Sequence, residues 1–182
     1  MTTSVPVSLG ERSYHIHIGE RLIESAGALL APHLGTSAAR RVPIITDENV
    51  ARLHYPAFAA SLTDAGLFPV PVVLPPGEQT KSFGNLERVV DSLLSANVER
   101  GSLIVALGGG VIGDLTGFAA GVVKRGIGLI LNSPPNCEHL SKTCRTKCTI
   151  ISAEAIPRAS NRSKAAARVR WQTCVCLCYR GR

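Results

Sequence analysis

The stretch at residues 102–120 is SLIVALGGGVIGDLTGFAA, and it decides how the rest of the chain is interpreted. Its first six residues form a continuous apolar run, which is typical of a buried strand. Three glycines follow, and residues 111–123 have the pattern of a helix of small residues. Backbone N–H groups at such a helix start carry about half a positive charge and can approach a phosphate closely, because glycine has no side chain. The stretch therefore predicts a strand, a phosphate-binding turn and a helix.

The sequence on either side of this stretch alternates between strand and helix patterns. Apolar residues alternate with polar ones near the N-terminus, which predicts a hairpin of two short strands within residues 5–18. Pro56 is expected to kink or interrupt the second of the predicted helices. Further strands are expected at residues 42–46, 70–74, 102–107 and 127–131, and helices at residues 21–34, 47–65, 82–94 and 111–123. Strands that alternate with helices predict an α/β fold, with a Rossmann-like, mostly parallel sheet after the N-terminal hairpin.

Residues 108–113 satisfy the pattern G-x-G-x-x-G, which is found in dinucleotide-binding turns. Two features differ from an ordinary turn of that kind. The glycines follow a late strand instead of the first one, and residues 115–137 contain no Asp or Glu that could hold an adenosine ribose. A tight turn without any ligand therefore stays open as the plainer interpretation.

The composition divides the chain near residue 130. Residues 1–130 hold 10 Lys and Arg, 11 Asp and Glu, and 16 of the 17 glycines. Residues 131–182 hold another 10 Lys and Arg, only two acidic residues and all six cysteines, so the basic character of the chain belongs to this tail. The interpretation is an incomplete α/β domain over residues 1–130 and a basic, cysteine-containing tail over residues 131–182.

Hydropathy excludes several classes of protein. A hydrophobic content of 45% excludes intrinsic disorder of the whole chain. No apolar run approaches the roughly 18 to 20 residues that span a bilayer. Residues 1–10 have neither the basic head nor the apolar segment of a signal peptide. We therefore expect a cytoplasmic protein.

Five blocks within residues 1–130 resemble one enzyme family, the 3-dehydroquinate synthases. The block GGGVIGDLTGFAA at residues 108–120 is similar to the central motif of that family, and PGEQTKS at residues 76–82 is similar to its nucleotide-contacting loop. The blocks RSYHIHIG at residues 12–19, ITDENV at residues 45–50 and KRGI at residues 124–127 are similar to three further segments. Five blocks in the same order are not expected by chance.

The resemblance implies a lyase of the shikimate pathway, which serves aromatic amino acid biosynthesis. Its substrate is a seven-carbon sugar-acid phosphate, 3-deoxy-arabino-heptulosonate 7-phosphate, which loses phosphate and closes a carbocycle to give 3-dehydroquinate. NAD transiently oxidises one hydroxyl of the substrate, and a divalent metal, zinc or cobalt, polarises the oxygen that is oxidised. The expected partners are this small substrate and, for the intact family, a second copy of the chain. A membrane or a nucleic acid is not expected.

The resemblance also implies a role for single residues. The residues expected to bind the cofactor NAD are Asp47, Glu78, Lys81, Gly109, Gly110, Val111 and Asp114. In this assignment the carboxylates accept hydrogen bonds from ribose hydroxyls, Lys81 supplies positive charge, and the glycines lie near the pyrophosphate. Arg125 is expected to contact an anionic group of the substrate, because a guanidinium fork suits phosphate and carboxylate geometry.

The residue types alone leave plainer roles open for the charged members of this set. Asp47 is a plausible helix cap, and Glu78 and Lys81 could be solvated charges of a loop. Asp114 could complement the dipole of the helix that follows the glycines. His15 and His17 are expected on the polar face of a strand, and no histidine of the chain is assigned as a metal ligand.

The resemblance ends after residue 130. The family would continue with a Thr-rich nucleotide turn, a Gly-Gly-Lys block and a helical domain that brings the metal ligands. The tail matches none of these, and the spacing of its cysteines, Cys137, Cys144, Cys148, Cys174, Cys176 and Cys178, fits no accepted zinc site. We expect residues 131–182 to be disordered or to result from a change of reading frame. The chain by itself is then predicted to lack catalytic activity.

Three alternative functions stay open at this point. Related sugar-phosphate cyclases share the N-terminal half with the 3-dehydroquinate synthases. The iron-dependent alcohol and glycerol dehydrogenases share a triple-glycine turn, but their glycines are typically followed by a pattern that ends in Asp-x-Ala-Lys, whereas residues 114–118 here are DLTGF. A different class is a nucleic-acid binder that uses the basic tail.

Overall fold

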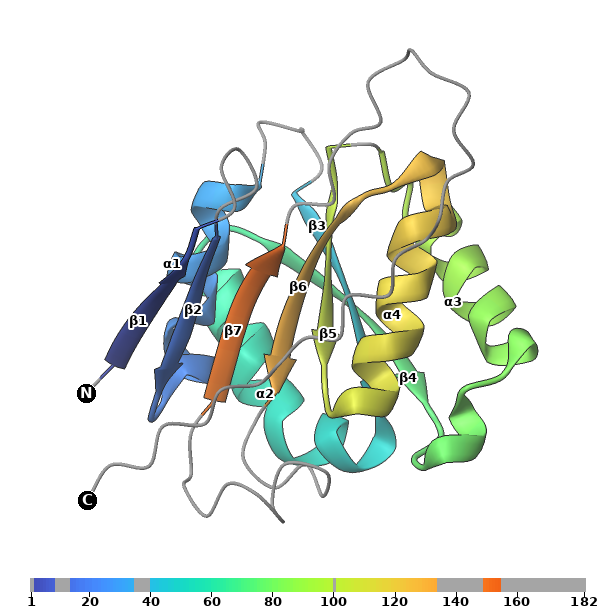
Figure 1. Ribbon diagram of the computed structural model, residues 1–182, viewed down its shortest axis with the longest axis horizontal. Coiled ribbons are helices and arrows are strands. Elements are labelled where there is room, and N and C mark those ends of the chain that lie inside the picture. Colours follow the sequence, from blue (N-terminus) through green and yellow to red (C-terminus); the bar gives the residue numbers. More distant parts are fainter. Residues whose placement is uncertain (1, 9–13, 35–39, 100, 134–148, 155–182) are drawn as a thin grey trace.

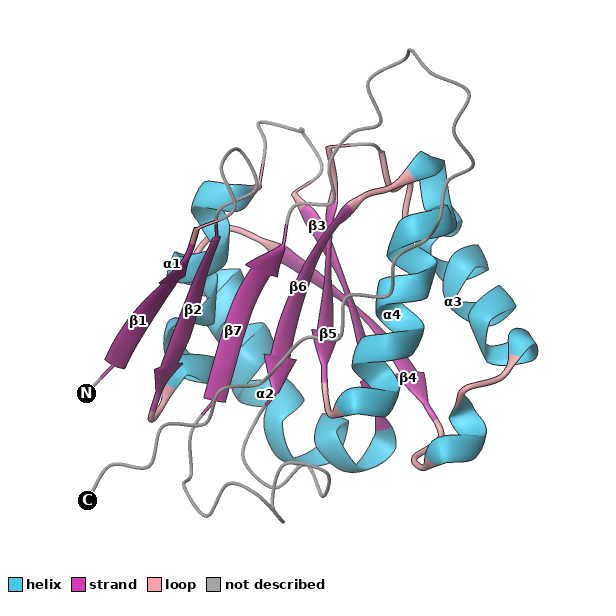
Figure 2. Ribbon diagram, in the orientation of Figure 1, coloured by secondary structure: helices cyan, strands magenta, loops and turns pink. Residues whose placement is uncertain are grey.

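The computed structural model describes residues 2–8, 14–34, 40–99, 101–133 and 149–154 (Figure 1). The described residues form one sheet with helices on both of its faces (Figures 1 and 2). The strands are β1 (Thr2–Val7), β2 (Tyr14–Gly19), β3 (Arg41–Asp47), β4 (Phe68–Leu74), β5 (Leu103–Leu107), β6 (Gly128–Ser133) and β7 (Thr149–Glu154). Their order in the sheet is β1-β2-β7-β6-β5-β3-β4.

The sheet has a parallel part and an antiparallel part. Strands β4, β3, β5 and β6 are parallel neighbours, so that Ile44 of β3 lies beside Val105 of β5, which lies beside Ile130 of β6. Strands β1 and β2 form the expected N-terminal hairpin. Strand β7 pairs antiparallel with both β2 and β6 and thereby joins the hairpin to the parallel strands. The predicted α/β fold is confirmed, whereas β7 was not anticipated.

The helices are α1 (Ala26–Leu30), α2 (Glu48–Asp64), α3 (Phe83–Ser95) and α4 (Gly110–Val122). The single helix expected at residues 21–34 is wrong, because α1 is flanked by two short 3-10 helices, Leu22–Ser25 and Ala31–His33. Pro32 has no N–H to continue an α-helix, which agrees with the end of α1 at Leu30. The expected interruption at Pro56 is also wrong. Helix α2 runs through this exposed proline, because Phe58 and Leu62 beyond it are fully buried in the core.

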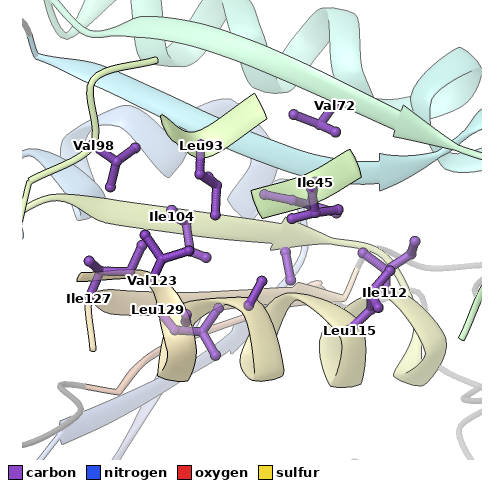
Figure 3. Close-up of a cluster of buried hydrophobic side chains, with 14 of the residues drawn as sticks. Ile45, Val72, Leu93, Val98, Ile104, Ile112, Leu115, Val123, Ile127 and Leu129 are labelled. Atoms are coloured by element: carbon purple, nitrogen blue, oxygen red, sulfur yellow. The ribbon is translucent and has the colours of Figure 1, made fainter. Parts of the chain in front are cut away.

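Two apolar clusters hold the helices against the sheet. Helices α1 and α2 pack on one face, against Ile44, Val105 and Ile130. Helices α3 and α4 pack on the other face, where Ile45 and Ile104 contribute to the cluster shown in Figure 3. Successive strand residues point to opposite faces, so β3 and β5 need apolar residues at almost every position. This requirement explains the continuous apolar run before the glycines.

The predicted division at residue 130 falls within strand β6 and stays a prediction. Strand β6 crosses that position without a break and ends at Ser133, and the short strand β7 lies within the predicted tail. The rest of the tail, including all six cysteines, lies outside the described residues. Within the described part of the chain, no helix is long and apolar enough to cross a membrane.

Helix α1 approaches α2 closely at Gly27. The N–H of Gly27 donates a hydrogen bond to the Ser61 hydroxyl, with a distance of 3.0 Å. A Cβ atom at Gly27 would lie 2.0 Å from the main-chain oxygen of Ser61 and 2.8 Å from Cβ of Ala65. Gly121 in α4 provides a contrast, since a Cβ atom there would meet nothing within 4 Å.

We therefore expect opposite effects from two equal substitutions. Gly27→Ala should lower the free energy of unfolding by about 1–3 kcal/mol, because α1 and α2 must separate. Gly121→Ala should raise it by about 0.5–1 kcal/mol, because alanine favours a helix. Urea denaturation followed by far-UV circular dichroism measures both values. Equal effects of the two substitutions would show that α1 does not pack on α2 in this way.

Candidate functional site

The sheet has a topological switch point between β3 and β5. These two strands are parallel neighbours, but the helix that follows β3, α2, lies on one face, whereas α4, which follows β5, lies on the other. The chain therefore diverges beyond the carboxyl ends of the two strands (Figure 1). Ligands of open α/β sheets bind in the crevice at such a point. Asp47 ends β3, and Gly108 follows β5.

Asp47 caps helix α2. Its Oδ1 atom accepts hydrogen bonds from the N–H groups of Asn49 and Val50, each at 3.0 Å. Its Oδ2 atom accepts no hydrogen bond from the described residues. Asp47 is half-buried at the end of β3, beside the switch point. The role as a helix cap, left open by the residue type alone, is thus observed, and it leaves one oxygen for a further donor.

Helix α4 begins without a side-chain cap. Helix α3, in contrast, is capped by the Ser82 hydroxyl, which accepts from the N–H of Asn85 at 3.3 Å. The N-cap residue of α4 is Gly109, and the first bond of the helix is from the N–H of Gly113 to its carbonyl, at 2.9 Å. The preceding N–H groups, at residues 110–112, therefore point out of the helix and are free to bind an anion.

The glycines of the turn serve different purposes. A Cβ atom at Gly108 would lie 3.0 Å from both Cβ and Cγ1 of Ile112, so packing alone favours glycine there. A Cβ atom at Gly110 would meet no atom within 4 Å, and Gly110 is exposed. Internal packing therefore gives no reason for glycine at position 110. Close approach of a ligand to the backbone would give one.

Lys81 connects the loop after β4 to helix α4. Its Nζ atom lies 3.0 Å from Oε1 of Glu78 and 2.9 Å from Oδ2 of Asp114. The hydrogen bonds to Asp114 and Glu78 raise the pKa of Lys81, so its ammonium stays charged. Three of the residues expected to bind the cofactor are thus brought together beside the start of α4.

The loop that carries Glu78 and Lys81 is held by contacts that the sequence analysis did not single out. Gly77 has a φ of 101°, which only glycine adopts easily. The hydroxyl of Thr80, which is fully buried, donates to the carbonyl of Pro75. The side-chain amide of Asn85 donates to the carbonyl of Thr80 at 3.1 Å. No clear sequence signal pointed to these contacts, because the burial of Thr80, which makes its hydroxyl need a partner, becomes visible only in the structure.

The end of β6 holds the glycine turn from the other side. The N–H of Gly108 donates to the carbonyl of Asn132 at 2.9 Å, and the Ser133 hydroxyl donates to the carbonyl of Gly108 at 3.2 Å. The side chain of Asn132 is buried and has no hydrogen-bond partner among the described residues. Neither residue was predicted to belong to the site, because both lie beyond the last matching block.

Arg125 does not join the other predicted residues. It follows the C-terminal end of α4, in the 3-10 helix Val123–Arg125, and precedes the amino end of β6. The glycine turn lies at the opposite end of α4 and of the sheet (Figure 1). Asp47, Glu78, Lys81, Gly109, Gly110, Val111 and Asp114, in contrast, all lie at the carboxyl edge of the parallel strands.

Two histidines, His15 and His17, lie on strand β2 of the N-terminal hairpin. The rings of His15 and His17 are stacked, with centroids 6.3 Å apart. Burial lowers the pKa of His17, and the charges of His15 and His33 lower it further. Among the described residues, no three side chains of His, Cys, Asp and Glu are grouped so that they could hold a metal ion.

The comparisons with known proteins agree with this geometry. The family model described as 3-dehydroquinate synthase N-terminal matches residues 71–135. The 3-dehydroquinate synthase of Brucella anthropi is 51% identical over 128 residues, which cover 70% of this chain and 33% of that protein. That of Brucella ovis is 50% identical over 129 residues, which cover 71% of this chain and 33% of that protein. The chain spans about a third of the length of these curated relatives.

Solved structures of two other enzymes have a similar fold. A 2-deoxy-scyllo-inosose synthase complexed with carbaglucose-6-phosphate, NAD+ and Co2+ superposes with a TM-score of 0.61 at 23% identity, over 72% of this chain and 34% of that chain. The 2-epi-5-epi-valiolone synthase of Streptomyces hygroscopicus, with NAD+ and Zn2+ bound, gives a TM-score of 0.54 at 28% identity, over 62% of this chain and 30% of that chain.

The described domain therefore has the fold of the NAD-dependent sugar-phosphate cyclases. The NAD+ and divalent cations of the two solved neighbours agree with the cofactors expected for such proteins. Within this class, sequence identity of about half to the curated relatives distinguishes one family. The chain belongs, through its matched N-terminal part, to the 3-dehydroquinate synthase family, as its five sequence blocks predicted.

The cap formed by Asp47 can be tested separately from any ligand. Asp47→Ala removes the cap of α2 and should lower the free energy of unfolding by about 1 kcal/mol. Asp47→Ser keeps an oxygen that can accept from Asn49 and Val50, so its effect should stay below about 0.5 kcal/mol. Urea denaturation measures both. An equal loss in the two variants would mean that the charge of the carboxylate, and not the cap, stabilises α2.

Proposed function

We propose that this chain carries the NAD-binding half of a 3-dehydroquinate synthase. The observation that carries the proposal is the grouping of Glu78, Lys81 and Asp114 beside the uncapped start of α4, at the switch point of the sheet. The proposed substrate of the whole enzyme is the seven-carbon sugar-acid phosphate, and the proposed assembly is a homodimer. Both are taken from the family, since the chain spans only about a third of its curated relatives.

The described residues fit a dinucleotide. The free N–H groups at the start of α4 and the open space at Gly110 suit a pyrophosphate, which needs donors and close access to the backbone. The unused oxygen of Asp47 and the exposed carboxylates of Glu78 and Asp114 suit ribose hydroxyls, which are hydrogen-bond donors. When bound, NAD would supply the acceptor for a hydride from the substrate carbon that bears the hydroxyl, while the hydroxyl gives up its proton and becomes a ketone. The described side chains do not fit a catalytic metal, because no three of their His, Cys, Asp and Glu residues are grouped to hold one.

Related sugar-phosphate cyclase activity remains as a second candidate function. Such cyclases share the fold, and the two solved neighbours are a 2-deoxy-scyllo-inosose synthase and a 2-epi-5-epi-valiolone synthase. Their identity to this chain is 23% and 28%, whereas the curated 3-dehydroquinate synthases are 50% and 51% identical. This difference in identity favours a 3-dehydroquinate synthase.

Arg125 is proposed as a substrate contact from the resemblance only, because it lies at the far end of α4 from the glycine turn.

The proposed cofactor site predicts weak but specific binding of NAD+. We expect affinity in the millimolar range, because the resemblance assigns further nucleotide contacts to family segments outside the matched part. Gly110→Val places a side chain where the pyrophosphate would approach and should weaken binding at least about tenfold, or about 1.4 kcal/mol. Titration with NAD+, followed by amide chemical shifts of α4, measures both affinities.

A matched control for this titration is Gly121→Ala, which changes an exposed glycine at the other end of the same helix. Its affinity for NAD+ should equal that of the unchanged chain. The proposed site would be wrong if Gly110→Val bound NAD+ as well as the control did. Complete absence of NAD+ binding by the unchanged chain would contradict the proposed function itself.

We further propose that the 182-residue chain alone does not turn over the substrate, even with added zinc. The family's metal ligands are expected in its helical domain, and the described residues provide no substitute for them. Release of inorganic phosphate from 3-deoxy-arabino-heptulosonate 7-phosphate, with NAD+ and zinc present, measures activity. The enzyme from Brucella anthropi serves as a positive control. Phosphate release above that of a mock preparation would disprove the proposal.

A further inference from the structure

Helix α3 and the edge strand β4 form a groove outside the candidate site (Figure 1). The open groove has a volume of about 640 Å³, and Val70, Pro71 and Val72 line it from β4. The helix residues that line it follow one continuous face of α3, and they are Gly84, Glu87, Arg88, Asp91, Ser92 and Ser95. Val89 and Leu93, which pack on the sheet, lie on the other face of the helix.

Strand β4 is poorly suited to pair with a further strand along this edge. The N–H of Phe68 donates to the carbonyl of Arg40 at 3.0 Å, on the side of β3. Because N–H groups alternate in direction along a strand, residues 69, 71 and 73 face the outer edge. Pro69 and Pro71 have no N–H, so Val73 is the one residue of these three that can donate. The groove therefore suits a helix better than a strand.

The charged side chains of the groove sum to zero and are unpaired. They are Arg41 at the start of β3, and Glu87, Arg88 and Asp91 on α3. All four are exposed, and none of them forms an ion pair with a described residue. A surface that presents opposite charges in the matching positions would pair with them.

The groove face of α3 is complementary to a second copy of itself. In a two-fold symmetric contact, both copies use the same surface, so each residue contact occurs twice. For two α3 helices that pack antiparallel about an axis between residues 89 and 90, the six groove residues of the helix pair among themselves. The pairs are Arg88 with Asp91, Glu87 with Ser92, and Gly84 with Ser95. The central pair joins opposite charges, and the outer pair is small enough for close approach.

Two exposed aromatic side chains support the same arrangement. Phe68, at the start of β4, is 62% exposed, and Phe83, at the start of α3, is 87% exposed. Because α3 follows the carboxyl end of β4, the two helices and strands start at opposite ends of the groove. An antiparallel contact therefore brings Phe83 of each copy toward the end where Phe68 of the other copy lies. Removing this aromatic surface from water favours association.

We propose that the outer face of α3, together with the edge of β4, is an interface between two copies of this chain, with the α3 helices antiparallel. The inference rests on the proposed function only for the number of copies, since the homodimer was taken from the family without a contact surface. It does not involve the cofactor site, so each can fail without the other.

Sedimentation velocity of the full chain over a range of concentrations tests the interface. A reducing agent is present throughout, because the six cysteines could otherwise link copies. We expect a dissociation constant in the micromolar range, because the contact is small and polar. Arg88→Asp and Asp91→Arg should each weaken association at least about tenfold, since like charges then face each other. The matched control Arg52→Asp changes an exposed arginine of α2, on the other face of the sheet, and should leave association unchanged.

Two combinations of the variants distinguish this contact from a general loss of association. The double variant Arg88→Asp with Asp91→Arg should associate like the unchanged chain, because the two charges are exchanged. An equimolar mixture of the two single variants should form mixed dimers, since the acidic face of one variant meets the basic face of the other. Far-UV circular dichroism should be the same for all variants, because the substituted side chains are exposed.

Other results would overturn the inference. A chain that stays monomeric at every concentration would mean that this face does not join two copies. Association that neither charge reversal weakens would place the contact on another surface. Single variants that weaken association without rescue in the mixture would mean that Arg88 and Asp91 do not face each other. In each case binding of NAD+ by the unchanged chain would still support the proposed function, and its absence would contradict that function alone.

Discussion

The candidate site depends on the confinement of strand β5, which is buried along its whole length. Its backbone pairs with β3 on one side and β6 on the other, and its side chains enter the apolar clusters on both faces of the sheet. Because two strands and two apolar clusters fix the position of β5, the glycines that follow it also have a fixed position. The hydrogen bonds of Gly108 to Asn132 and Ser133 extend this control into the turn. The uncapped start of α4 is thus a fixed feature of the sheet edge.

The polar part of the site is assembled around that fixed edge. One oxygen of Asp47 accepts hydrogen bonds from N–H groups in the first turn of α2. The N–H groups in the first turn of α4 have no such side-chain acceptor. The neighbouring loop is held by the left-handed backbone of Gly77 and the buried hydroxyl of Thr80, and it brings Lys81 to Asp114. The arrangement combines free backbone donors with exposed carboxylate acceptors. A dinucleotide, with its phosphates and ribose hydroxyls, is the ligand class that uses both.

The apolar pattern of a buried strand predicted its element correctly, whereas the expected extents of two helices were wrong. The apolar run before the glycines correctly predicted β5, because only a strand covered on both faces needs such a run. The helix expected at residues 21–34 is divided, and α2 continues through Pro56. In α2 tertiary packing outweighed propensity, because the burial of Phe58 and Leu62 holds the helix together beyond the proline.

The sequence by itself determined the fold class, the family, and the segments that border the switch point, because periodicity and motif order are properties of neighbouring residues. Only the tertiary structure decided that Lys81 joins Glu78 to Asp114, that Arg125 lies at the far end of α4, and that β7 joins the hairpin to β6. These features link segments that are distant along the chain. Which of them meet is set by the order of strands in the sheet and by the faces on which the helices pack, and no local pattern records either.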